Sequence, residues 1–200
     1  MSLQRSSIDQ LIDLDTLHNQ DKVDVLLVLA KSKPAAIIEI SYFKDSGLTK
    51  RSFQNQIVLL SDILTQLNLA NKLKLNYPKS PEDLTEYSLI ALDRKMIGRL
   101  DHAQNNKDAF QRRLNLGRLL GYPDSAITAF SQGRSIDINQ LPKSVRDSVE
   151  LKFLNFRLSE NWQEELTYLK ERANKIRKVA PRLYSKILEK GQFKDLPGSL

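Results

Sequence analysis

Four side chains rich in hydrogen-bond donors lie close together near the start of an expected helix. They are Lys50, Arg51, Gln54 and Asn55. Arg, Gln and Asn can make paired hydrogen bonds to base edges in the major groove of DNA, and Lys can contact a phosphate. The chemistry that this group offers is therefore recognition of a nucleic acid, with no bond made or broken.

A second group of side chains has the chemistry of an acid–base site. Asp93, Arg94, Asp101 and His102 follow an apolar run that is typical of a buried strand. Polar groups at the end of a strand are favoured places for catalysis, and Asp and His are common proton carriers. An N-cap at Asp93 and a surface histidine at position 102 explain the same residues, so both interpretations stay open.

A Gly-Tyr-Pro turn supplies the remaining candidates. Arg118, Tyr122 and Asp124 surround this turn and are the best candidates to line a pocket. The enzyme hypothesis places a site in residues 85–135, built from Asp93, Asp101, His102, Tyr122 and Asp124. No phosphate-binding loop, dinucleotide fingerprint, metalloprotease motif or nucleophile elbow occurs, and these absences argue against an enzyme. With 2 histidines and no cysteine, we expect neither a zinc site nor any cofactor.

Composition describes an ordinary globular protein. The chain has 200 residues, of which 40% are hydrophobic and 28% charged, so it can form one large or two small domains. No apolar run approaches the ~20 residues that span a bilayer. The first residues lack the apolar core of a secretion signal. We therefore expect a cytoplasmic protein that does not enter membranes.

Positive charge is concentrated near one end of the chain. The net charge is +7, and residues 170–194 contain 9 basic and 2 acidic side chains. Such a local excess favours a polyanionic partner, and Arg177, Lys178 and Arg182 are our further candidates for nucleic-acid contacts. A solvated helix face, or a patch neutralised by an acidic neighbouring subunit, is an equally good interpretation of the same charges.

The first donor group requires a helix that presents it to solvent. Phe53, Ile57, Leu60, Leu64 and Leu67 recur at spacings of four and three, which predicts one apolar stripe on a helix over 49–67. A threonine at position 49 is a favourable N-cap. The stripe leaves the donor-rich side chains on the opposite face, where they can reach a partner.

The region from about residue 22 to 77 resembles the winged helix-turn-helix DNA-binding domains. The resemblance places helices at 23–30 and 36–44, the recognition helix at 49–67, and the wing around 69–77. It implies that Lys50, Arg51, Gln54 and Asn55 contact base edges and phosphates of double-stranded DNA. One departure is the interval from Glu39 to the turn glycine, which is longer than usual. Some winged helices also serve as protein–protein adaptors.

A proline-rich stretch at 76–81 predicts a boundary between two domains. We assign 1–77, with a leading helix at 8–20, to the winged helix-like domain and 78–200 to a mostly helical second domain. The latter is expected to contain a strand at 87–92, a heavily apolar helix at 144–158, a long helix from residue 161 that ends at Pro181, and a basic C-terminal helix. The expected fold class is mainly α with a little β, helical (α+β) in the second domain.

The segment Gly117–Phe130 faintly resembles an uncharacterised prokaryotic family in which paired cysteines follow the Gly-Tyr-Pro turn. Asp124, Ser125 and Ala126 occupy that region here, so a thiol-dependent role is excluded. Taken together, the sequence predicts a DNA-binding protein, a transcriptional regulator whose helical domain senses a small-molecule effector or forms a homodimer. The alternative is an uncharacterised enzyme or small-molecule-binding protein.

Overall fold

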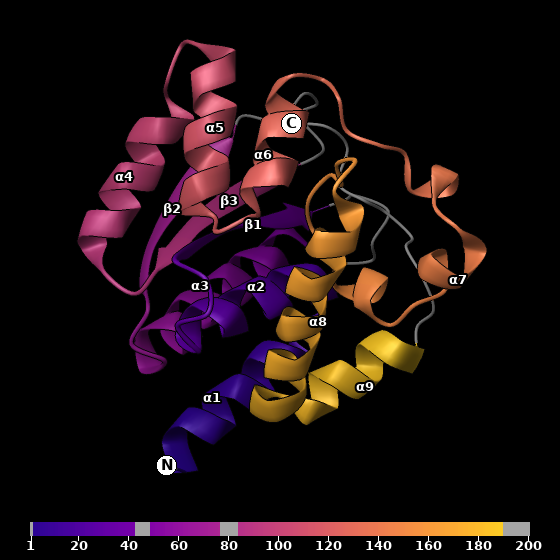
Figure 1. Cartoon of the computed structure of the whole chain (residues 1–200). Coiled ribbons are helices and arrows are strands. Elements are labelled where there is room, and N and C mark those ends of the chain that lie inside the picture. Colours follow the sequence, from indigo (N-terminus) through magenta and orange to yellow (C-terminus); the bar gives the residue numbers. More distant parts are fainter. Residues whose placement is uncertain (1, 43–48, 77–83, 190–200) are drawn as a thin grey trace. The chain divides into compact units, whose positions relative to one another are not determined.

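The computed structural model describes residues 2–42, 49–76 and 84–189. They belong to two compact units, 1–102 and 103–200 (Figure 1). The described part is mainly helical and contains one small antiparallel sheet, which lies wholly in the first unit. The expected fold class, mainly α with a little β, is confirmed at this level.

The first unit combines a three-stranded sheet with helices. Its elements are α1 (Ser2–Asp13), α2 (Asn19–Leu29), β1 (Ala35–Tyr42), α3 (Lys50–Gln66), β2 (Ala70–Asn76), β3 (Leu84–Ala91) and α4 (Arg94–Gln104), the last of which ends just past the unit boundary. The strand order is β1-β3-β2, and both pairings are antiparallel. The central strand β3 is therefore the last of the three in the chain.

Apolar side chains on both faces of the sheet hold the first unit together. Ile38 and Ile40 of β1 are almost fully buried, and α2 packs against β1 and β3. α3 packs against β1 and β2, whereas α4 lies on the opposite side of the sheet (Figure 1). Leu89, on the other face of β3, and Leu100 of α4 are also fully buried. This core fixes α3 on the sheet.

The expected helix at 36–44 is wrong, because the chain forms strand β1 there as far as Tyr42. The run Ile37-Ile38-Glu39-Ile40 is rich in β-branched side chains, which favour extended backbone. Burial follows a period of two, with Ile38 and Ile40 inside and Ile37 and Glu39 half-buried. Pairing with β3 completes the strand. Positions 43 and 44 lie outside the described residues.

The boundary between the units differs from the predicted division at 77/78. β3 hydrogen-bonds to both β1 and β2, so residues 84–91 belong to the first unit, which extends to His102. The strand expected at 87–92 is thus present but completes the first sheet. The leading helix also differs from 8–20, since α1 ends at Asp13 and a new helix begins at Asn19.

The second unit is helical in its described residues. Its elements are α5 (Ala109–Leu119), α6 (Asp124–Ser131), a 3-10 turn (Ile138–Gln140), α7 (Lys143–Arg146), a second 3-10 turn (Glu150–Phe153), α8 (Trp162–Val179) and α9 (Pro181–Glu189). Gly121 ends α5 with a φ of 68°. This left-handed conformation suits glycine and lets the Tyr122 N–H bond the Gly117 carbonyl at 3.1 Å.

The heavily apolar helix expected at 144–158 is not formed as one element. The chain makes only the short α7 and a 3-10 turn, and then extends. Leu154, Phe156 and Leu158 are buried at every second position, which is the period of extended backbone. These residues nevertheless form the core of the second unit with Ala126, Leu141, Leu151 and Leu169. Burial was predicted correctly for these residues but not for Val149, which is exposed, and the predicted secondary structure was wrong.

Candidate nucleic-acid interface

The N-terminal end of α3 is capped by its own sequence. The Thr49 hydroxyl oxygen accepts a hydrogen bond from the Ser52 N–H at 3.0 Å. The first turn of α3 contains no acidic residue, so nothing there neutralises the partial positive charge of the helix N-terminus. This end of the helix is therefore favourable for an anion such as a DNA phosphate.

The donor-rich residues point away from the core, as the apolar stripe predicted. Phe53, Leu60, Ile63 and Leu64 are at most 3% exposed, and Ile57 is half-buried. On the other side of α3, the side chains of Arg51, Gln54 and Asn55 are exposed, and these three residues are here called the donor face of α3. Lys50 is the first residue of the helix, and its side chain lies outside the described part.

The exposed side of α3 continues beyond the donor face. Val58, Leu59 and Asp62 are also exposed, so the polar first two turns lead into a short apolar stretch and then a carboxylate. Leu59 borders a hollow against α1, together with Leu14 and Asp13. The side of α3 that faces solvent is thus cationic and amide-rich at its start and acidic about three turns later.

Edge strand β2, which α3 contacts, carries two lysines whose charge is partly neutralised. The Asp101 carboxylate of α4 accepts hydrogen bonds from Lys72 at 2.6 Å and pairs with Lys74. The hydrogen bond from Lys72, followed by that from Lys74, lowers the pKa of Asp101 to about 2. Asp101 is therefore a charged partner of β2 and unsuited to the proton transfer that the enzyme hypothesis assigned to it.

Asp93 and His102 do not form a catalytic pair. The Asp93 carboxylate accepts the Met96 N–H at 2.8 Å and caps α4. His102 is exposed in the last turn of the same helix. Nine residues of α-helix separate their backbones by about 13 Å. The structure therefore favours the helix-cap interpretation of this group.

The basic candidates of the second unit occur where two helices meet. Arg177 and Lys178 are exposed in the last turn of α8, and Arg182 is exposed near the start of α9. Cations near a helix C-terminus also stabilise the helix through its dipole. Their positions suit either a phosphate-binding surface or simple helix stabilisation, so both interpretations of the sequence remain.

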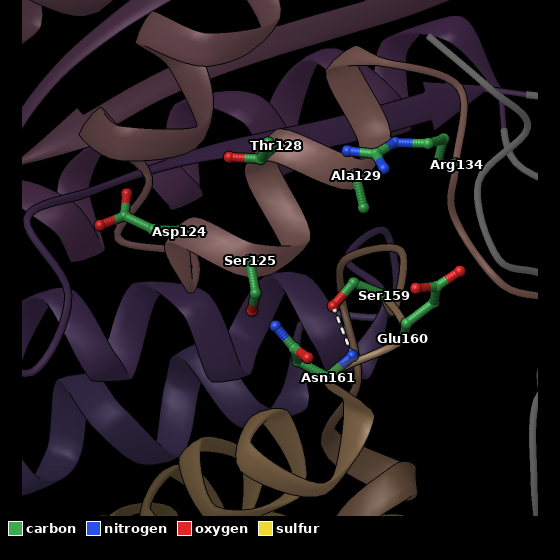
Figure 2. A pocket seen from close by; sticks show the side chains of 8 residues that line it. All are labelled: Asp124, Ser125, Thr128, Ala129, Arg134, Ser159, Glu160 and Asn161. Atoms are coloured by element: carbon green, nitrogen blue, oxygen red, sulfur yellow. Dashed lines mark hydrogen bonds between the residues drawn. The ribbon is translucent and has the colours of Figure 1, made fainter.

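The second unit contains a hollow of about 460 Å³ around the start of α6 (Figure 2). It is lined by Asp124, Ser125, Thr128, Ala129, Arg134, Ser159, Glu160 and Asn161. Asp124 is the first residue of α6 and is exposed, as expected for a residue that lines a pocket. Of the three pocket candidates near the Gly-Tyr-Pro turn, only Asp124 lines this hollow.

Tyr122 and Arg118, the other two candidates, lie elsewhere. The Tyr122 ring packs on Phe156 with 5.5 Å between centroids, next to the core of the second unit. Arg118 is exposed in the last turn of α5. Tyr122 is thus an anchor for the corner between α5 and α6, and neither residue joins Asp124 at the hollow.

A buried glutamate holds two of the serines that line the hollow. Glu165 of α8 is 1% exposed, and its Oε1 accepts hydrogen bonds from Ser125 at 2.6 Å and Ser159 at 2.5 Å. Its Oε2 accepts the Ser159 N–H at 2.9 Å, and the Ser159 hydroxyl accepts the Asn161 N–H at 3.1 Å (Figure 2). Each serine hydroxyl therefore donates its one hydrogen to Glu165, and its oxygen can act only as an acceptor toward other groups.

Sequence reasoning did not anticipate this arrangement. Ser125 and Glu165 are 40 residues apart, so no local spacing marks them as partners. Lys72 and Lys74 lie on one face of β2 because side chains alternate along a strand, and the position of Asp101 opposite them depends on the packing of α4. These contacts are tertiary, and no local sequence motif predicts them.

Comparisons of this chain with protein-family models, curated proteins and solved structures found no match. Within residues 2–42, 49–76 and 84–189, no helix has the length and apolar character that crossing a bilayer requires. The same residues include no group of three His, Asp or Glu side chains placed to hold a metal ion.

Proposed function

We propose that this protein binds double-stranded DNA through the donor face of α3 and acts as a cytoplasmic transcriptional regulator. The observation that supports this most directly is the orientation of α3. Its apolar side is buried within its own unit, while Arg51, Gln54 and Asn55 remain exposed together. A helix anchored in this way can enter the major groove with its donors directed at base edges.

Charge favours the same end of the helix. Arg51 lies in the first turn of α3, where acidic residues are absent and the backbone N–H groups carry partial positive charge. A phosphate near this end is stabilised both by the Arg51 side chain and by the backbone N–H groups. Arg51 and Asn55 are one helical turn apart, so they can contact neighbouring base pairs.

The antiparallel pair β2–β3 supports a winged helix-like arrangement around α3. It follows the helix directly in the chain, where the resemblance places a hairpin wing. β1 takes the place of the expected second helix, so the proposed domain has a strand where a helix-turn-helix motif has its first helix. The proposal therefore relies on the helix and the hairpin.

The second unit would supply regulation. We assign it a role as a helical sensor or dimerisation domain, and Arg177, Lys178 and Arg182 would add phosphate contacts. Each added contact makes binding more sensitive to salt, because every neutralised phosphate releases counterions. Sedimentation of the full-length protein, alone and with duplex DNA, would reveal whether a homodimer binds.

Binding to fluorescein-labelled duplexes, measured by anisotropy over a series of salt concentrations, tests the proposal. A pool of random duplexes first yields a preferred sequence by selection. The matched variants are Arg51→Lys, which keeps the charge and loses the planar fork, and Arg51→Ala, which loses both. Asn55→Ala removes a second donor.

We expect Arg51→Lys to lower the preference for the selected sequence about tenfold with little change in salt dependence, and Arg51→Ala to reduce both. Asn55→Ala should lower sequence preference and leave the salt dependence unchanged. Circular dichroism should show that all three variants are folded, since the side chains are exposed. Equal affinity of wild type and all three variants for the selected and random duplexes would contradict the proposal.

The hollow of the second unit supports a second candidate function, binding of a small polar molecule. Hydroxyl, carboxylate, amide and guanidinium groups line one hollow there, and polar groups of these kinds orient a ligand in such sites. Ser125, Ser159 and Asn161 lie near one another in it, whereas the Asp124 and Glu160 carboxylates point to opposite sides (Figure 2). Asn161 makes no side-chain cap bond to α8, so it can be changed without loss of a cap. A metabolite that raises the melting temperature of wild type but not of Asn161→Ala would support this role. The control is the exposed helix residue Lys143→Ala.

A further inference from the structure

Val58 is an apolar residue in an unusual place. Its side chain is 61% exposed, the highest value among the exposed large hydrophobic residues in the described ranges. It lies on α3 between Asn55, one turn before it, and Asp62, one turn after it. An exposed β-branched residue here contributes nothing to the core and is a poor helix former. Single exposed apolar residues are common on protein surfaces, so the feature that distinguishes Val58 is its position relative to the donor face.

The geometry of an α-helix places Val58 on the same line as the donor face. At about 100° per residue, the seven residues from Arg51 to Val58 make two turns less about 20°. The two side chains therefore point in nearly the same direction, about 10 Å apart along the helix axis. Base pairs in a duplex are about 3.4 Å apart, and a recognition helix enters the groove at an angle to the duplex axis, so this separation corresponds to about two to three base-pair steps.

Leu59, the next residue, is also exposed and lies one helical turn after Asn55. It points about 100° further around α3 than Val58 and borders the hollow against α1 with Leu14. Val58 is therefore the apolar residue in line with Arg51, and Leu59 lies at the border of the donor face. A stable protein–protein interface buries at least ~1,200 Å², far more than these two side chains supply. A small apolar target surrounded by polar groups fits Val58 better than a protein partner does.

The major groove of DNA contains such a target. The C5-methyl group of thymine is the apolar feature of its base edges, and small apolar side chains recognise it. We propose that Val58 contacts a thymine methyl group, so that the duplex bound by α3 contains an A·T pair about two to three steps from the base pair that Arg51 contacts. The inference rests on the proposed DNA binding and identifies one base, a thymine, that α3 would recognise.

The test replaces one chemical group at a time in the selected duplex. Each thymine is exchanged in turn for uracil, which lacks the C5-methyl group and keeps every hydrogen-bonding atom. Wild-type protein should lose about three- to fivefold in affinity at one position, the effect of removing one methyl group from an apolar contact. Val58→Ala should lose a similar factor on the thymine duplex and nothing further when that thymine becomes uracil.

Thr65→Ala is the matched control, because Thr65 is exposed on the same helix two turns beyond Val58. It should keep the full response to uracil. Sequence-selective binding that is unaffected by uracil at every position would overturn the inference and leave the proposed function intact. Absence of any selected sequence would overturn both. If Val58→Ala instead converts a dimer to a monomer in sedimentation and retains the uracil response, Val58 belongs to a protein interface and the inference fails.

Discussion

Lys33 and Asp24 form a buried ion pair that links the middle of α2 to the loop before β1. The distance from Lys33 Nζ to Asp24 Oδ2 is 2.5 Å, and the two side chains are 1% and 9% exposed. Buried charges are costly unless they are paired, so each member of the pair depends on the other. The sequence does not reveal this pair, because a lysine nine residues after an aspartate is ordinarily at the surface.

We predict that Lys33→Met lowers the free energy of unfolding by about 3 kcal/mol, because the buried Asp24 carboxylate loses its ion pair with Lys33. The double variant Asp24→Asn, Lys33→Met should recover more than half of this loss. Urea unfolding of wild type, both single variants and the double variant measures the coupling. A loss below about 0.5 kcal/mol for Lys33→Met would show that solvent screens the pair.

Asp21 lies near two other carboxylates, those of Asp24 and Glu39. Burial, together with repulsion from Asp24 and Glu39, raises its pKa to about 7 in the folded protein. The unfolded chain ionises near pH 4, so the folded state binds the extra proton between about pH 4 and 7. The contribution of Asp21 to the free energy of unfolding is therefore highest below pH 4, falls up to pH 7, and then stays constant.

Asp21→Asn should remove this dependence, because an amide does not ionise. We expect the variant to be more stable than wild type at pH 8 by about 1–2 kcal/mol, with a smaller difference at pH 5.5. Urea unfolding at both pH values checks the sign. An equal difference between the two proteins at pH 5.5 and 8 would mean that Asp21 stays ionised throughout this range.

At the scale of elements, close packing of α5 on α6 depends on a glycine. A Cβ atom added to Gly117 would approach Ile127 Cγ1 at 2.7 Å and Cγ2 at 3.0 Å, closer than real side chains come. Gly98 of α4, in contrast, faces open space. The two glycines have the same helix propensity and opposite surroundings, so they form a matched pair.

Gly117→Ala should therefore destabilise the protein by about 1–3 kcal/mol through overpacking. Gly98→Ala should stabilise it by about 0.5–1 kcal/mol, since alanine is the better helix former. Thermal unfolding monitored by circular dichroism distinguishes these signs. Stabilisation by both substitutions would show that Ile127 moves aside at little cost.

The whole molecule divides where the sheet is complete. β3 is the central strand, and β1 and β2 each pair with it on opposite sides. A fragment that ends before β3 leaves two strands that do not pair with each other, whereas residues 1–102 contain the full sheet. Two-stranded or unpaired β-structure is rarely stable alone.

We predict that fragment 1–102 folds cooperatively and retains binding to the selected duplex, while fragment 1–77 is unfolded. Circular dichroism and amide dispersion in NMR spectra measure folding, and anisotropy measures binding. A cooperatively folded 1–77 fragment would place the boundary at the proline-rich stretch after all. A folded 1–102 fragment without affinity for DNA would instead show that the second unit is needed for binding.

Local sequence determined the elements whose signals are strong and short-range. The four-and-three spacing from Phe53 to Leu67 and the cap at Thr49 specify α3, and the structure places its buried and exposed sides as predicted. The end of α8 before Pro181 was likewise predicted, since this effect depends on backbone geometry alone.

Only tertiary structure decided the remainder. Ile37–Ile40 became a strand because β3 pairs with it, and the apolar run after Ser144 was broken because its residues reach the core in extended backbone. The partners of Asp101, Lys33 and Glu165 were likewise fixed by packing. Helix caps and stripes are read within a few residues, whereas strand pairing and buried polar contacts join segments that only the folded chain brings together.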